Sequence, residues 1–436
     1  MTNIAIVGSG PSGCYLADML AKKLKDARID VYDRLPTPFG LARAGVAPDH
    51  QGTKNIIKQF ERTFARDNVT FVGNVTVGKD VTYSELKEHY DAVALTVGAM
   101  QDRSLNIPGN ELNGVYGSGA FVGWYNGHPD YSAQVAELNS KAIAIVGNGN
   151  VSLDIARVLA KTESELASSD ISKAAASIIS ATPLQDIYLI GRRGPADASF
   201  TNMELNEFAE LERCVTLVNA DDLPANVPES TDPMRAREVE NNLATLRGFS
   251  ENNANDKPIR LHLLFNSAPV EVLGDDSVQG LRLAKTQIVE GKTTLTDETF
   301  DLDVQTVISA IGYRSQAVTD APFDDARGII PNEDGIVEPG VYTAGWCKRG
   351  PQGVIPANRM DAMGVGKRII ADLEQNPSQA PTSGFDAICP LLDERQVRTV
   401  SYTDWEKINA EEVARATGEK PREKLTSIAE MLALLD

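Results

Sequence analysis

Residues 4–33 read IAIVGSGPSGCYLADMLAKKLKDARIDVYD and contain the pattern that decides the fold. The apolar run predicts a strand over 4–7, and a glycine-rich turn at 8–13 follows it directly. A helical pattern over 15–25 comes next, and a second apolar run predicts a strand over 29–32. A strand, a glycine turn, a helix and a second strand within about thirty residues are typical of a dinucleotide-binding unit.

The glycines of this turn, Gly8, Gly10 and Gly13, have the spacing of a pyrophosphate-binding loop. They permit a tight turn and let a pyrophosphate approach the start of the helix, where free N–H groups and the positive end of the helix dipole lie. Asp33 ends the second strand, where its carboxylate can accept hydrogen bonds from an adenosine ribose. The turn therefore predicts a dinucleotide site, and its position alone does not distinguish FAD from NAD.

A second unit of the same design lies at 141–160, KAIAIVGNGNVSLDIARVLA. Ser152 stands where the third glycine would be, and its small side chain still allows the helix to pack closely on the strand. The strand predicted over 186–191 is followed by Arg192 and Arg193, where an acidic residue would select NAD. Two guanidinium groups at that edge can clamp a 2′-phosphate, so this unit predicts an NADP(H) site.

Two such units in one chain predict an α/β protein with two Rossmann-like dinucleotide-binding domains. Turn-forming residues at 106–115 and 316–335 mark the expected boundaries. Because the chain after 335 has no dinucleotide motif of its own, we expect the NADP domain to be inserted into the first domain. The first domain would comprise 1–105 and 319–436, ending in a helical tail, and the NADP(H)-binding domain would comprise 106–318.

Composition narrows the possible functions. A chain of 436 residues suggests two or three domains, and its net charge of -19 argues against nucleic acid, which needs a basic surface. No apolar run approaches the roughly 20 residues that span a bilayer. The first strand follows Met1-Thr2-Asn3 directly, without the basic segment that opens a targeting signal. We therefore expect a cytoplasmic protein that binds neither nucleic acid nor membranes.

Cysteine and histidine are too dispersed to predict a metal or redox site. The four cysteines are Cys14, Cys214, Cys347 and Cys389, and the four histidines are His50, His89, His128 and His262. No C-x-x-C or C-x-x-x-x-C pair occurs, which argues against a redox disulfide, a zinc site and an intrinsic iron–sulfur cluster. We expect no bound metal.

With both glycine turns in view, the chain resembles the adrenodoxin-reductase type of NADPH–ferredoxin reductase, within the glutathione-reductase-like flavoprotein superfamily. Matching stretches include VGSGPSGCYLA, PTPFGLARAGVAPDHQGTKN, VGNGNVSLDIARVL, GRRGPADASFTNMEL and GWCKRGPQGVIPANRMDA. They extend from residue 4 to about residue 362, and GVAPDH and GWxKRGPxGVI are far more specific than either glycine turn. The resemblance implies FAD in the first domain and NADP(H) in the second.

The resemblance also implies particular cofactor contacts. FAD would contact Gly8, Gly10, Pro11, Ser12, Gly13, Asp33, Leu41, Val77, Trp346, Gly353, Val354 and Ile355. NADP(H) would contact Asn148, Gly149, Asn150, Val151, Arg192, Arg193, Glu204 and the backbone at Gly353. His50 and Glu207 would form the polar catalytic pair beside the nicotinamide and the flavin, and would tune hydride transfer, which needs no strong acid or base.

Three positions depart from the family pattern. Asp33 stands where many relatives have glutamate, so a shorter side chain would reach the ribose. Ser152 replaces a more usual alanine. Ala357 stands where relatives often have threonine, and it offers no hydroxyl.

The implied function is electron transfer between carriers that exchange different numbers of electrons. NADPH gives a hydride, whereas an iron–sulfur carrier such as ferredoxin accepts one electron at a time, and FAD can do both because its semiquinone is accessible. Because the chain has no cysteine pair, the acceptor would be a separate protein. The alternatives are an FAD/NADPH-dependent monooxygenase, an NADPH-oxidising subunit of a larger complex, and a non-catalytic NADP sensor.

Ferredoxins are commonly acidic, so a chain of net charge -19 needs a local basic surface to bind one. The helix predicted after GVAPDH has a basic stripe opposite an apolar one. The basic stripe is Lys54, Lys58, Arg62 and Arg66, and the apolar stripe is Ile56, Ile57, Phe60 and Phe64. Arg235, Arg237 and Arg247 form a second basic group, so we expect docking near Lys54, Lys58, Arg62, Arg235 and Arg237.

Overall fold

The structure is a computed structural model that describes residues 2–227, 232–353, 355–375 and 382–436. It divides into two compact units, which we call the terminal unit and the inserted unit. The terminal unit comprises Met1–Gln101, Tyr313–Thr417 and Pro421–Asp436, and the inserted unit comprises Asp102–Gly312 and Gly418–Lys420. Apart from the short excursion at Gly418–Lys420, the chain changes unit at the short strands β5 (Gln101–Asp102) and β15 (Tyr313–Arg314), whereas the sequence predicts boundaries at 106 and 319.

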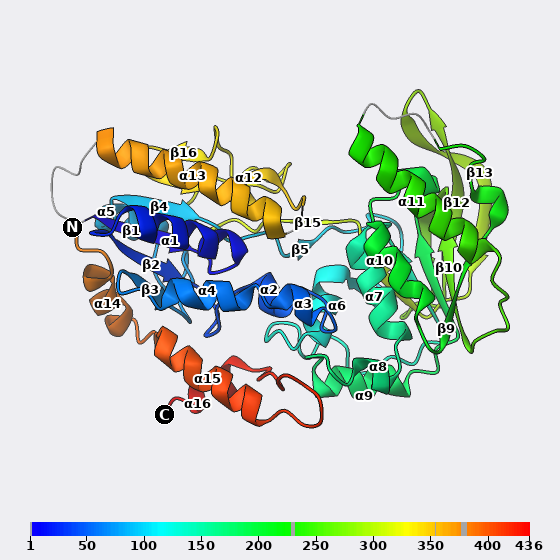
Figure 1. Cartoon of the computed structure of the whole chain (residues 1–436), viewed down its shortest axis with the longest axis horizontal. Coiled ribbons are helices and arrows are strands. Elements are labelled where there is room, and N and C mark those ends of the chain that lie inside the picture. Colours follow the sequence, from blue (N-terminus) through cyan, green and yellow to red (C-terminus); the bar gives the residue numbers. More distant parts are fainter. Residues whose placement is uncertain (1, 228–231, 354, 376–381) are drawn as a thin grey trace. The chain divides into compact units, whose positions relative to one another are not determined.

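A six-stranded sheet in the order β16-β17-β4-β1-β2-β3 forms the centre of the terminal unit (Figure 1). Its strands are β1 (Asn3–Val7), β2 (Arg28–Tyr32), β3 (Val69–Val72), β4 (Ala92–Leu95), β16 (Ile336–Glu338) and β17 (Val341–Thr343). Neighbouring strands are parallel except β16 and β17, which are antiparallel. Strand β1 is buried along its whole length, which explains why its residues 4–7 are continuously apolar rather than alternating.

Helices cover both faces of this sheet. They are α1 (Pro11–Lys23), α2 (Leu41–Ala44), α3 (Gln51–Lys54), α4 (Ile57–Phe64), α5 (Tyr83–His89), α12 (Trp346–Arg349), α13 (Ile355–Gln375), α14 (Phe385–Glu394), α15 (Tyr402–Ala414) and α16 (Ile428–Ala433). On one face Ile4 and Ile6 pack with residues of α1, α4, α13 and α15. On the other face Ala5 and Val7 pack with residues of α5 and α14. Helices α1 and α13 lie side by side (Figure 1).

Two helices of the terminal unit differ from the sequence expectation. Helix α1 begins at Pro11 rather than at residue 15, because proline is well suited to the first turn of a helix. The single helix expected after His50 is two helices, α3 and α4, separated by Asn55 and Ile56. The basic and apolar stripes predicted there therefore do not lie on one continuous helix.

The inserted unit has a six-stranded, all-parallel sheet in the order β6-β14-β7-β8-β10-β9. Its strands are β6 (Val115–Gly117), β7 (Ala142–Val146), β8 (Asp186–Ile190), β9 (Cys214–Val218), β10 (Ile259–Leu264) and β14 (Thr306–Ser309). An antiparallel sheet of β11 (Ser267–Leu273), β12 (Gly280–Val289) and β13 (Lys292–Leu302) packs on one face through Leu281 and Leu283.

Helices pack on the other face of the inserted sheet, where Ile143 and Ile145 of β7 point. They are α6 (Ser118–Tyr125), α7 (Asn150–Ala160), α8 (Glu163–Leu166), α9 (Lys173–Ala181), α10 (Asn202–Asn206) and α11 (Pro233–Ser250), with short 3₁₀ turns η1 (Pro195–Asp197), η2 (Glu207–Ala209) and η3 (Ala220–Asp222). In each unit a glycine turn follows a central strand, β1 or β7, at its carboxyl end. Open α/β sheets bind ligands at that edge.

Candidate functional site

In the glycine turn of the terminal unit, Gly8 and Gly13 are closely packed, whereas Gly10 has open space beside it. Gly8 has φ of +108°, and a Cβ there would lie 2.6 Å from the Thr96 carbonyl oxygen. A Cβ on Gly13 would lie 2.0 Å from the Gly8 carbonyl oxygen, so both positions exclude a side chain. A Cβ on Gly10 would meet nothing within 4 Å. The backbone at Gly10 is therefore the place where a ligand can approach the turn.

The start of α1 offers donors to such a ligand. The residue that precedes the helix is Gly10, which has no side chain to accept from the first-turn amides, and that turn contains no acidic residue. These N–H groups and the helix dipole favour an anion such as a pyrophosphate. Asp33 lies beside the turn, where its Oδ2 accepts from Ser9 N at 3.0 Å and from the Ser9 hydroxyl, while its Oδ1 accepts from Leu35 N at 3.0 Å. The Asp33 carboxylate, which is predicted to accept hydrogen bonds from the ribose, is thus held next to the predicted pyrophosphate loop.

Two distant segments of the terminal unit close on this turn. A Cβ on Gly40 would lie 3.0 Å from Gly10 Cα, and Phe39 N donates to the Ser9 carbonyl at 3.1 Å, which places Leu41 at the start of α2 close by. A Cβ on Gly345 would lie 2.1 Å from Ser12 Oγ, so the residue before Trp346 also contacts the turn. The sequence did not single out Thr96, whose hydroxyl donates to the carbonyls of Val7 at 3.0 Å and Gly8 at 2.8 Å.

The remaining predicted FAD contacts are less closely tied to the turn. Trp346 begins α12, its ring stacks on Tyr313 at 6.3 Å between centroids, and its Nε1 is buried with no hydrogen-bond partner among the described residues. Gly353 is exposed with φ of +79°, Ile355 begins α13, and Val354 lies outside the described residues. Val77 is half-buried and packs against the core on the α5 face of the sheet.

The second glycine turn, in the inserted unit, is shaped in the same way. Gly147 has φ of +145°, and a Cβ there would lie 2.3 Å from the Ala310 carbonyl oxygen. Gly149 precedes α7, so no side chain caps that helix, and its first turn has no acidic residue. The Asn148 carbonyl accepts from Ser199 N and Ser199 Oγ, both at 2.9 Å, and Asn150 Oδ1 accepts from Thr201 N at 2.8 Å. The segment after η1 thus holds the turn in place.

The predicted arginine pair lies beside this turn. A Cβ on Gly191 would lie 2.6 Å from Asn148 Nδ2, so the end of β8 contacts the turn, and Arg192 and Arg193 follow immediately with exposed side chains. Arg193 Nε donates to Thr293 Oγ1 at 3.1 Å, and the Arg192 carbonyl accepts from Thr286 Oγ1 at 2.8 Å. Arg193 NH1 also lies 3.9 Å from Asp197 Oδ1. Two exposed guanidinium groups just after β8 offer the donors and the positive charge that an anion would need.

Glu204 and Glu207 share a buried partner that the sequence pattern did not single out. Arg157 of α7 is fully buried, with NH1 3.2 Å from Glu204 Oε2 and Nε 3.1 Å from Glu207 Oε2. Its NH2 lies 2.8 Å from Asp154 Oδ1. Arg157 lies one turn after Leu153, on the buried face of α7, where the helical pattern calls for an apolar residue. A cation at such a position could have indicated, from the sequence alone, a buried ion pair. His50, the other member of the predicted catalytic pair, is half-buried before α3 in the terminal unit.

Comparison with known proteins identifies the family of this chain. Residues 2–361 match the family described as pyridine nucleotide-disulphide oxidoreductase. The human mitochondrial NADPH:adrenodoxin oxidoreductase is 42% identical over 452 residues, covering 99% of this chain and 91% of that protein. The chain belongs to this family. The NADPH-ferredoxin reductase FprA of Mycobacterium tuberculosis is 38% identical over 454 residues, covering 99% and 98%.

A solved structure of this pyridine nucleotide-disulphide oxidoreductase family, M. tuberculosis FprA in complex with NADPH, superposes with a TM-score of 0.94. It is 36% identical, and the match covers 99% of each chain. The family resemblance and the α/β fold class predicted from the sequence are confirmed by these relatives, as is the choice of FAD and NADP(H) as cofactors.

The cysteines of this member of the family are free thiols. Cys14, Cys214 and Cys347 are buried, and Cys389 is partly exposed. Burial raises the pKa of Cys14 and Cys347, and raises that of Cys214 to about 12. Since the thiolate is the reactive form, burial disfavours reaction of these three thiols.

The basic surface expected for a partner is altered by the structure. Lys54 is buried, and its Nζ donates to the Arg43 carbonyl at 3.3 Å, so it does not belong to an exposed stripe. Arg235 is half-buried, and its NH2 donates to the carbonyls of Ala196 at 3.0 Å and Ala198 at 2.8 Å. Its guanidinium group therefore supports the backbone at 196–198 and is less accessible to a partner than an exposed arginine. Lys58, Arg62 and Arg237 are exposed.

Among the described helices, none combines the length and apolar character needed to cross a bilayer.

Proposed function

We propose that this chain is an NADPH–ferredoxin oxidoreductase that holds FAD in the terminal unit and NADP(H) in the inserted unit. The observation that carries the proposal is the full-length relationship to enzymes of this kind, combined with two glycine turns whose surroundings suit two different dinucleotides. FAD, when bound, supplies the change from two-electron to one-electron transfer. The protein contributes binding, orientation and exclusion of water.

The terminal unit would hold FAD through the open backbone at Gly10 and the first-turn amides of α1, with Asp33 accepting from the ribose. The residues present fit the group, because the turn excludes side chains at Gly8 and Gly13 but is open at Gly10. Leu41, Trp346 and the segment that begins at Gly345 would complete the site. The proposal also includes FAD contacts at Val77, Gly353, Val354 and Ile355.

The inserted unit would hold NADP(H) through the turn Gly147–Asn150, with Val151 in the first turn of α7. Arg192 and Arg193 would bind the 2′-phosphate, because two exposed guanidinium groups at the end of β8 offer donors and charge where NAD-specific sites place an acid. Glu204, held by Arg157, would contact the nucleotide, and Glu207 together with His50 would tune hydride transfer.

The electron acceptor would be a separate iron–sulfur protein of the ferredoxin type. Relatives are named as reductases of adrenodoxin or ferredoxin, which supports this class of partner. Docking on the terminal unit would use Lys58 and Arg62, which line an open groove of about 530 Å³ together with Tyr15, Ile56 and Ile355. Arg237 remains an exposed basic candidate for docking on the inserted unit.

The expected cytoplasmic location also remains a proposal, since some relatives are mitochondrial.

The deciding experiment is anaerobic reduction in two steps. NADPH is added to the FAD-loaded protein while the flavin absorbance is followed, and a ferredoxin is then added as the acceptor. Bleaching by NADPH, followed by NADPH-dependent reduction of the ferredoxin, supports the proposal. Bleaching without transfer to any ferredoxin, but with hydroxylation of a small substrate under oxygen, indicates the monooxygenase alternative instead. A flavin that never bleaches indicates a sensor.

A further inference from the structure

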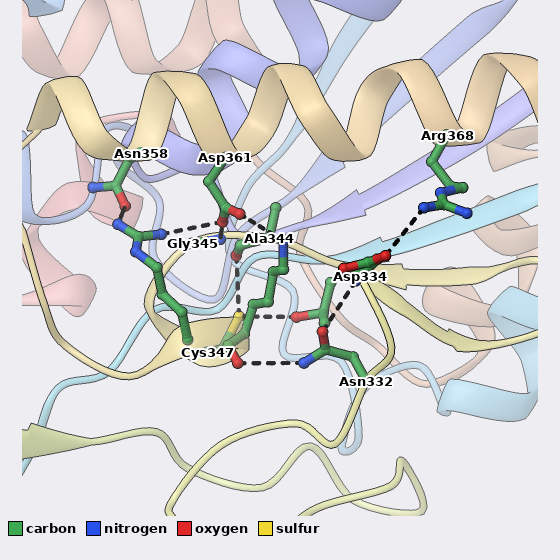
Figure 2. Close-up of polar contacts among 12 residues, drawn as sticks. Asn332, Asp334, Ala344, Gly345, Cys347, Asn358, Asp361 and Arg368 are labelled. Atoms are coloured by element: carbon green, nitrogen blue, oxygen red, sulfur yellow. Dashed lines mark hydrogen bonds and ion pairs between the residues drawn. The ribbon is translucent and has the colours of Figure 1, made fainter.

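One carboxylate on α13 holds three groups of the segment that follows β17 (Figure 2). Asp361 Oδ2 accepts from the backbone N of Gly345 at 2.5 Å and from Arg349 NH1 at 3.1 Å. Its Oδ1 accepts from Lys348 Nζ at 2.7 Å. Because the Asp361 side chain is only 12% exposed, these charge-assisted bonds are largely shielded from water.

A second residue of α13 reinforces this contact from the same side of the helix. Asn358 lies three residues before Asp361, and Figure 2 shows both side chains directed toward the segment that contains Gly345 and Cys347. Asn358 Oδ1 accepts from Arg349 NH2 at 2.7 Å, and Arg349 NH2 also donates to the Gln352 carbonyl at 3.2 Å. Helix α13 therefore holds residues 345–352 through both ends of one guanidinium group.

The segment needs such anchors because its own backbone is permissive. Gly345, Gly350 and Gly353 have φ values of +84°, +86° and +79°, in the left-handed region that glycine enters without strain. Only four residues, Trp346–Arg349, form a helix between them. The same segment contacts the glycine turn, where a Cβ on Gly345 would lie 2.1 Å from Ser12 Oγ.

We propose that Asp361 is a positioning residue for FAD, an assignment that rests on the proposed function of the terminal unit. It fixes residues 345–352 against the glycine turn, and it sets the charge of the segment that would border the flavin in the proposed function. Lys348 and Arg349 carry two positive charges, and Asp361 neutralises one of them. Flavin gains negative charge when it is reduced, so the charge of this cluster bears on its reduction potential.

The first test uses a buried thiol as a reporter. Cys347 lies within the segment and is fully buried, and its Sγ donates to the carbonyls of Ala344 and Leu95. In the FAD-free protein, Asp361→Asn should speed alkylation of Cys347 by about tenfold or more, since losing a charge-assisted bond shifts local opening by at least that factor. Cys14 and Cys214, also buried, should keep the parent rate, read by mass spectrometry of the peptides. Equal acceleration at all three cysteines, or none, overturns the proposal.

The second test separates positioning from general loss of stability by the sign of a potential. In the FAD-loaded protein, Asp361→Asn should weaken FAD binding and move the midpoint potential of the bound flavin to a more positive value. Lys348→Met should move it to a more negative value. Asp334→Asn is the matched control, because Asp334 is an exposed carboxylate nearby that pairs only loosely with Arg368 at 3.6 Å (Figure 2).

Opposite shifts in the two variants, with the parent potential in the Asp334→Asn control, support the proposal. If Asp361→Asn does not fold, Lys348→Met alone still decides, because an unchanged or more positive potential overturns the proposal. A parent protein that binds no FAD overturns the proposed function and this inference together. A parent that binds FAD, with Asp361→Asn unchanged in affinity and potential, overturns the inference alone.

Discussion

Arg157 of α7 and Glu204 of α10 form an ion pair within the inserted unit, with 3.2 Å between NH1 and Oε2 and with the arginine side chain fully buried. Glu207 and Asp154 bind the same guanidinium group. A buried cation that holds three carboxylates is costly to remove, because each carboxylate is then left near the core without its counter-charge.

Arg157→Met should therefore lower the free energy of unfolding by about 3–5 kcal/mol, the usual cost of breaking a buried pair. Urea unfolding measures this change. Lys22→Met is the control, since it removes an exposed i,i+4 pair with Asp18 and should cost less than about 1 kcal/mol. Equal costs for the two variants would show that the Arg157 cluster contributes no more than a surface pair.

Replacement of Arg192 and Arg193 together by alanine should raise KM for NADPH at least tenfold and leave KM for NADH nearly unchanged. Each charge-assisted contact to a 2′-phosphate contributes about 1.5–3 kcal/mol, and NADH has no such phosphate. Steady-state reduction of a dye with each nucleotide measures the effect. If the parent enzyme uses the two nucleotides equally well, the arginine pair is not a specificity determinant.

Lys58→Glu and Arg62→Glu should each slow association with an acidic ferredoxin, by about two- to tenfold at low salt, and flatten the salt dependence of its reduction. Both side chains are exposed at the groove on α4. Lys407→Glu reverses an exposed charge on α15 of the same unit and serves as the control. A variant that slows reduction of a small neutral dye as much as ferredoxin would place the defect in folding or flavin binding.

His50→Gln and Glu207→Ala should each slow flavin reduction by NADPH within roughly 10²-fold, at the low end for groups that assist proton movement. Stopped-flow measurement of flavin absorbance gives the rate at saturating NADPH. Complete loss of reduction with the nucleotide still bound would make these residues essential. Parent rates in both variants would leave them no role in the reaction.

The Arg395 guanidinium lowers the pKa of Glu85 to about 2 through hydrogen bonds to both carboxylate oxygens, one of them at 3.0 Å. The ordinary value is about 4.3, so this carboxylate stabilises the fold above that pH, and the contribution disappears as the pH falls toward 2. Glu85→Gln keeps a residue suited to the capping box with Thr82 but removes the charge. The difference in unfolding free energy between parent and variant should therefore shrink from pH 6 to pH 3. Glu88→Gln, exposed on the same helix, controls for loss of one charge, and a pH-independent difference would contradict the prediction.

The features that the sequence predicted are those encoded by local pattern. An apolar strand, a glycine turn and a helix follow one another at β1 and α1 as the local pattern predicts, whereas the binding of a pyrophosphate at Gly8, Gly10 and Gly13 stays a prediction. Arg192 and Arg193 likewise come just after β8 and are exposed, as the local pattern predicts, and their contact with a 2′-phosphate stays a prediction.

The features that the sequence did not predict depend on contacts between segments far apart in the chain. Thr96 supports the first turn from the end of β4, and Asp361 holds Gly345 from α13. The helical pattern predicts Lys54 on an exposed stripe, but the break after α3 directs it toward the Arg43 carbonyl. Periodicity along one segment carries no information about such tertiary contacts, or about where a helix breaks without proline or glycine.

The insertion has a consequence for synthesis on the ribosome. Strand β4 lies between β1 and β17 in the sheet, yet β1 and β4 belong to the first 101 residues, and β17 begins at Val341. At about 5–20 residues per second, β4 would wait roughly ten to fifty seconds for its second neighbour while the inserted unit emerges. An unpaired parallel edge over that interval can associate with other chains. The nascent terminal unit therefore has an exposed sheet edge that a chaperone could shield during this interval.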